Sequence, residues 1–149
     1  MKSLPLVKVN FIISSEKLDF DGVTSKLSIF PSGIVKKEDI KVKEFAKNLW
    51  MLFVDYTHTR CIDEPFERLI KSLRGKEKEL LEIQRTYNAE FTFEVIIEMD
   101  EFKAPEILLP VEITRFIGSI GAELAFDMYP NMKGIFSRVK NYFGRWSKD

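Results

Sequence analysis

His58 and Cys61 are the single histidine and the single cysteine of the chain. A thiol beside an imidazole can act as an activated nucleophile when a third group orients the imidazole. The two residues are three positions apart in a segment expected to be a loop, so a particular turn is needed to bring them together. We expect an ordinary loop here and keep a catalytic or small-ligand site at His58 and Cys61 as an alternative.

The sequence lacks the residues that a metal site or a phosphate-binding loop needs. A structural zinc site takes four ligands, mostly Cys and His, and one of each cannot supply them. Asp19, Asp21 and Asp127 can form an acid cluster, but a helix cap, a helix-start acid and an edge-strand acid explain them. Gly118 and Gly121 match neither a dinucleotide fingerprint nor a nucleophile elbow. The sequence therefore favours a protein that is not an enzyme, with no catalytic residue, metal or cofactor.

Charge is distributed unevenly along a chain that is neutral overall, with 23 basic and 23 acidic residues. Residues 90–127 hold nine acids and two bases, a net charge of −7, whereas residues 131–149 hold five bases and one acid, a net charge of +4. A balanced total argues against a general nucleic-acid-binding surface. The pattern predicts an acidic second half followed by a basic tail.

The candidate partner-binding surface lies in and after a strand expected at residues 89–100. Alternation places its acids and Ile96 on one face and its large apolar residues on the other. A solvated outer face explains this pattern, but an acidic surface with an apolar centre also suits a basic protein partner, because opposed fields steer encounter. The predicted binding residues are Glu90, Glu94, Ile96, Glu98, Asp100 and Glu101.

The tail at residues 131–149 is predicted to be a basic amphipathic helix. Ile135, Val139, Phe143 and Trp146 recur at helical spacing with bases between them. Such a helix can pack on its own sheet, bind a partner or a second copy, or lie on an anionic membrane surface. These alternatives stay open, and we predict Phe143 and Trp146 as the contact residues of the tail.

The elements that position these groups are predicted from periodicity. We expect strands at 6–14, 49–56, 89–100 and 123–129, and helices after Asp19, at 63–75, from residue 76 and after Pro110. Residues 34–48 hold either a short edge strand at 40–45 or no regular element. Trp50 and the Phe-rich stripes are expected in the core, with Leu124, Phe126 and Met128 facing inward.

This order of elements predicts an α+β two-layer sandwich. We expect one mainly antiparallel sheet of four to five strands with helices on one face, ferredoxin-like in character. Residues 1–130 would form this single domain, which suits a chain of 149 residues.

Composition also indicates the compartment. One cysteine excludes an intramolecular disulfide and fits a reducing cytosol. The longest apolar run is residues 49–54, far below the roughly 20 residues of a membrane span. Pro5, Lys8 and Asn10 interrupt the first apolar stretch, which is unlike a secretory signal. We expect a cytoplasmic protein.

Three stretches resemble a bacterial family catalogued as domain of unknown function 4279. They are residues 18–27 leading to Pro31 and Ser32, Trp50 on the second long strand, and the closing segment 120–129. The likeness extends over about residues 6–130. It implies a small α+β domain without an assigned activity or known catalytic residues. Small bacterial domains of this kind are sometimes encoded beside toxins as immunity proteins.

From these observations we expect a non-enzymatic protein-binding module. Its most concrete form is an immunity-type inhibitor whose acidic surface covers a basic toxin active site, such as that of a nuclease. One alternative is a homo-oligomeric structural domain that dimerises through the tail or an exposed strand edge. The other is a small-ligand-binding protein or enzyme that uses the loop of His58 and Cys61.

Overall fold

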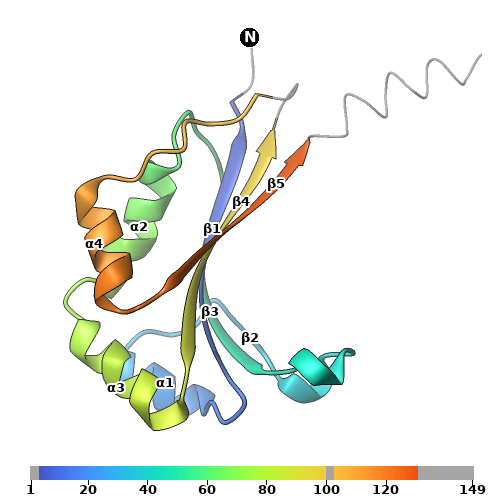
Figure 1. Ribbon diagram of the computed structural model, residues 1–149, viewed down its shortest axis with the longest axis vertical. Coiled ribbons are helices and arrows are strands. Elements are labelled where there is room, and N and C mark those ends of the chain that lie inside the picture. Colours follow the sequence, from blue (N-terminus) through green and yellow to red (C-terminus); the bar gives the residue numbers. More distant parts are fainter. Residues whose placement is uncertain (1–3, 100–102, 131–149) are drawn as a thin grey trace, which may run out of the picture.

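A mixed sheet of five strands carries four α-helices on one of its faces (Figure 1). The computed structural model describes residues 4–99 and 103–130. In chain order, the elements are β1 (Leu6–Ser15), α1 (Phe20–Leu27), β2 (Gly33–Val35), β3 (Asn48–His58), α2 (Asp63–Leu73), α3 (Glu77–Tyr87), β4 (Glu90–Met99), α4 (Val111–Ser119) and β5 (Glu123–Pro130).

The strand order is β2-β3-β1-β4-β5, and every neighbouring pair is antiparallel except β4 and β5. In the β1–α1–β2 unit, β3 lies between the two strands, which is the split arrangement of a ferredoxin-like sheet. Helix α3 is added before β4, and α4 returns the chain to place β5 parallel to β4 at the edge. The predicted α+β sandwich with a mainly antiparallel sheet is confirmed.

The core lies between the sheet and its helices, and Phe93 of β4 is at its centre. The Phe93 ring has its centroid 4.9 Å from that of Phe11, 5.2 Å from Phe66 and 6.5 Å from Phe116. These rings come from two strands and two helices, so one aromatic cluster joins both layers. Trp50 of β3 is fully buried, as predicted.

Two glycines end helices as the sequence indicates. Gly75 follows α2 with φ of 82° and Gly121 follows α4 with φ of 64°. A positive φ carries little steric cost for glycine, so the chain can turn sharply at these points. Asp19 precedes α1 as predicted, but its side chain makes no capping hydrogen bond.

Of the two alternatives for residues 34–48, the edge strand at 40–45 is not formed. That segment contains two short 3-10 turns, and the edge strand is β2, further upstream. Ser32 decides the register, because its N–H donates to the Met51 carbonyl at 2.8 Å and its Oγ accepts the Phe53 N–H at 3.0 Å. Pairing with β3 therefore starts at Gly33.

Leu124, Phe126 and Met128 lie on the helix side of the sheet, as predicted, but they are not buried. Their side chains are 38%, 39% and 44% exposed. They lie beside core residues of β4, but β5 is the outermost strand and no described helix buries them. Residues 131–149, predicted as a C-terminal helix, lie outside the described residues. Within the described ranges, no helix has both the length and the apolar character that a membrane crossing requires.

Candidate functional site: the open face of the sheet

The face of the sheet opposite α1–α4, here called the open face, carries the predicted acidic residues. Glu90, Glu94, Ile96 and Glu98 alternate along β4 with buried core residues. The geometry therefore places these four predicted residues together on one surface. Asp100 and Glu101, the other two predicted acids, lie outside the described residues.

Strand β5 extends the acidic surface in a way that the sequence did not indicate. Its parallel register with β4 places Glu123 beside Thr92, Asp127 beside Ile96 and Tyr129 beside Glu98. Alternation along a strand places Asp127 and Tyr129 on one face, but the crossover through α4 determines that β4 is the neighbouring strand. The open face thus gains two carboxylates.

Little within the structure neutralises these acids. Glu90 forms an exposed ion pair with Lys47, at 3.4 Å. Among the described residues, Glu94, Glu98, Glu123 and Asp127 form no ion pair. The negative field of the β4–β5 side therefore extends outward, where an oppositely charged molecule can respond to it.

Asn10 holds Glu94 in place near the middle of the open face. Asn10 is only 6% exposed, and its Nδ2 donates to Glu94 Oε1 at 3.0 Å. Asn10 Oδ1 accepts no hydrogen bond from the described residues. An unsatisfied buried acceptor costs about 1–3 kcal/mol, so this position favours arrangements that supply a donor.

The β3 side of the open face is aromatic. The Lys8 ammonium lies 4.5 Å from the ring centre of Phe53 and 5.8 Å from that of Tyr56. An irregularity in the β1–β3 register between Val7 and Val9 leaves residues 55 and 56 of β3 opposite Lys8. This local bulge turns Tyr56 onto the same face as the acids.

The Tyr56 phenol interacts with the acidic side of the open face. Partial burial, and then the nearby Glu98 carboxylate, raise the pKa of the Tyr56 phenol. The phenol therefore stays protonated at neutral pH and remains a hydrogen-bond donor. The described residues of the open face offer many hydrogen-bond acceptors and half-buried apolar groups.

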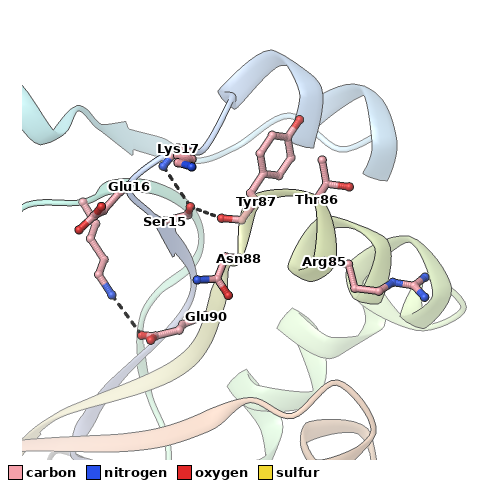
Figure 2. A pocket seen from close by; sticks show the side chains of 9 residues that line it. Ser15, Glu16, Lys17, Arg85, Thr86, Tyr87, Asn88 and Glu90 are labelled. Carbon is pink, nitrogen blue, oxygen red and sulfur yellow. Dashed lines mark hydrogen bonds and ion pairs between the residues drawn. The ribbon is translucent and has the colours of Figure 1, made fainter.

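A separate polar cavity of about 340 Å³ lies where β1 and α3 end and β4 begins (Figure 2). The Ser15 hydroxyl donates to the Tyr87 carbonyl and accepts the Lys17 N–H at 3.1 Å, so it is occupied by structural bonds. The charged side chains at the rim are Glu16, Lys17, Lys47, Arg85 and Glu90. Their mixed signs give no net preference for one ligand charge. The sequence gives no sign of this cavity, because three segments that are distant in the chain form it.

His58 and Cys61 each contact a backbone carbonyl. His58 Nδ1–H donates to the Leu4 carbonyl at 2.8 Å, and Cys61 Sγ lies 3.8 Å from the Leu108 carbonyl. Burial, and then a side-chain hydrogen bond with Asp63 and its charge, raise the pKa of the Cys61 thiol. An activated cysteine needs the opposite shift. These contacts give the alternative of a nucleophilic site no support.

The Cys61 thiol is expected to react slowly with a disulfide reagent near neutral pH. The thiolate is the reactive form, and a raised pKa lowers its fraction at any pH below that pKa. The rate should be several-fold lower for the folded chain than for the chain in denaturant, and should keep rising into more alkaline pH. Stopped-flow titration with an aromatic disulfide measures both. Equal rates for the folded and unfolded chains would contradict the assignment.

The three aspartates considered as an acid cluster do not converge. Asp19 and Asp21 lie at the start of α1 in the helix layer, whereas Asp127 lies on the open face of β5. The described residues contain no group of three or more His, Cys, Asp or Glu side chains able to hold a metal ion. The predicted tail contacts, Phe143 and Trp146, lie outside the described residues.

A family model described as Domain of unknown function (DUF4279) matches residues 5–131. The chain belongs to this family. The match confirms the resemblance drawn from the sequence and covers all described elements. Neither the curated proteins nor the solved structures contain a match to the chain.

The three stretches that carry the DUF4279 resemblance have clear structural places. Residues 18–27 form the entry to α1 and the helix itself, and residues 120–129 form the turn after α4 and most of β5. Trp50 lies fully buried on β3, and its Nε1–H donates to Thr24 Oγ1 of α1 at 3.0 Å. In this DUF4279 chain the shared residues thus build the scaffold, while the acids of the open face come mainly from β4.

Proposed function

We propose that this chain is a non-enzymatic protein-binding module that receives a basic protein on its open face. The observation that carries the proposal is the row of carboxylates on β4 and β5, of which, among the described residues, only Glu90 forms an ion pair, with Lys47. Complementary fields raise association rates and fix the register of a complex. A surface of this kind selects its partner by charge before close contact is made.

The composition of the open face favours a protein over a small molecule. Half-buried apolar groups, including Ile12, Phe53 and Ile96, lie among the acids, and Tyr56 and Tyr129 are 43% and 53% exposed. Protein interfaces combine such aromatic anchors with a polar rim. The surface spreads over four strands, which exceeds the reach of a small ligand.

The most concrete form of the proposal is an immunity-type inhibitor. A nuclease toxin carries basic side chains where it holds nucleic-acid phosphates. An acidic sheet face can cover such a site and compete with the phosphates for the same cations. Family membership supplies no activity, so this form rests on the charge and shape of the open face.

Charge reversal on the open face tests the proposal. The variant Glu90→Lys with Glu98→Lys changes both ends of the β4 row while leaving the Asn10–Glu94 hydrogen bond and β5 intact. The matched control, Glu64→Lys with Glu112→Lys, makes the same change in net charge on the helix layer, where both acids are exposed. Each variant and the wild type serve as bait in extracts of the native host at low and high salt.

We expect one stoichiometric basic partner to remain on the wild type and on the control. The face variant should bind it at least about tenfold more weakly, because two attractive contacts become repulsive. High salt should weaken the wild-type complex. Equal retention by the face variant, or no specific partner at either salt, would refute the proposal. Thermal unfolding of all three proteins establishes that each is folded.

A further inference from the structure

The outer edge of β5 is long and partly apolar, and no other described strand pairs with it. Seven of its eight residues are exposed, and Leu124, Phe126 and Met128 line the helix side. The ladder with β4 runs without interruption from Glu123 to Pro130. Among residues 4–99 and 103–130, none pairs with the other side of β5 (Figure 1).

The two edges of the sheet differ in how they are protected. Proteins blunt exposed edges with short strands, lysines, prolines or bulges. At the opposite edge, β2 has three residues and is followed by Lys36 and Lys37. Strand β5 contains no lysine, and its one proline, Pro130, is its last residue. From Glu123 to Tyr129, the β5 edge therefore has no lysine, proline or bulge, and its charged side chains are Glu123 and Asp127.

We infer that β5 pairs antiparallel with β5 of a second copy, joining two five-stranded sheets into one continuous sheet. Two-fold dimers are the commonest symmetric oligomers, and an exposed sheet edge can bind another strand through backbone hydrogen bonds. The inference concerns the sheet edge and is independent of the partner proposed for the open face. Both open faces remain accessible in this dimer, side by side on the same surface.

Symmetry and charge select one register. A two-fold axis perpendicular to the sheet pairs each β5 residue with a residue of the second copy whose side chain lies on the same face. The residue numbers of an opposed pair therefore add up to the same even value along the whole strand. Centring the pair on Ala125 opposes Glu123 to Asp127, and centring it on Asp127 opposes two identical carboxylates; both cost energy. The register centred on Phe126 is the longest one without a like-charge pair.

The Phe126 register is also complementary in its side chains. On the helix side, Phe126 meets Phe126 of the second copy, and Leu124 meets Met128. These three residues are exposed apolar groups on the helix side of β5. On the open face, Ala125 meets Asp127, and Glu123 meets Tyr129, whose phenol can donate to the carboxylate. Aromatic and apolar cross-strand pairs of this kind stabilise antiparallel ladders.

The full chain tests this inference by its mass in solution. Light scattering after size-exclusion chromatography should give twice the 17.4 kDa of the chain at micromolar concentration. The variant Phe126→Lys places two ammonium groups at the two-fold axis and should be monomeric. The matched control is Phe30→Lys, since Phe30 is 88% exposed and lies away from β5; it should remain dimeric.

The register is tested by a cross-link. Phe126→Cys, combined with Cys61→Ala, should form an intermolecular disulfide on mild oxidation, because directly opposed residues have Cβ atoms about 4.5–5.5 Å apart. Ile34→Cys in the same background, on the β2 edge, should not. A monomeric wild type, or a dimer unchanged by Phe126→Lys, overturns the inference. A dimer that dissociates with Phe126→Lys but fails to cross-link overturns the Phe126 register.

Discussion

Replacing Phe93 with alanine is expected to lower the free energy of unfolding by about 3–5 kcal/mol. Phe93 is fully buried, and its ring touches rings from β1, α2 and α4. The truncation removes apolar contacts and leaves a cavity that several rigid neighbours cannot collapse to fill. Urea denaturation followed by circular dichroism measures the change.

Phe30→Ala is the matched control for this experiment. It removes the same atoms from a side chain that is 88% exposed, so the free energy of unfolding should change by less than about 0.5 kcal/mol. A loss of under about 1 kcal/mol for Phe93→Ala would show that the sheet and helix layers do not depend on this aromatic cluster.

Replacing Trp50 with alanine is expected to cost a similar amount, about 3–5 kcal/mol. Two effects contribute at this position, because the indole is fully buried and its N–H donates to the Thr24 hydroxyl on α1. The side chain therefore both fills the core and ties the helix to β3. We expect a loss of stability comparable to that of Phe93→Ala. Part of this loss should come from the hydrogen bond to Thr24, and that part can be measured separately from the loss of packing.

Thr24→Val separates that polar part. It nearly preserves the shape of the Thr24 side chain and leaves the indole N–H without its partner, which should cost about 1–3 kcal/mol. Trp50→Phe and the double variant complete a thermodynamic cycle in urea denaturation. If Thr24→Val leaves stability unchanged, the hydrogen bond contributes nothing, and the effect of Trp50→Ala is packing alone.

The acidic site was only partly predictable. The period-two pattern of β4 was enough to place Glu90, Glu94 and Glu98 on one face, since successive strand residues point to opposite sides. It could not show that Asn10 binds Glu94 or that Asp127 lies beside Ile96. Those neighbours come from other strands, and strand order depends on how the whole chain packs.

The errors have the same origin. Leu124, Phe126 and Met128 alternate as a buried face does, and only their position on the outermost strand leaves them exposed. The lysine-rich segment after β2 has no regular alternation of apolar and polar residues that would mark a strand. The hydrogen bonds between Ser32 and β3 determine where the pairing begins. Such contacts join residues about twenty positions apart, beyond the reach of a local pattern.

The amino-acid sequence alone determined the long strands, the helices, the glycine stops at Gly75 and Gly121, the buried Trp50 and the family. These features follow from local periodicity and backbone sterics, which neighbouring residues encode. Only the tertiary structure decided the strand order, the bulge that brings Tyr56 to the acids, and the free edge of β5. These features depend on which surfaces of the folded chain pack against each other. That packing involves segments distant in the sequence, so no local pattern predicts it.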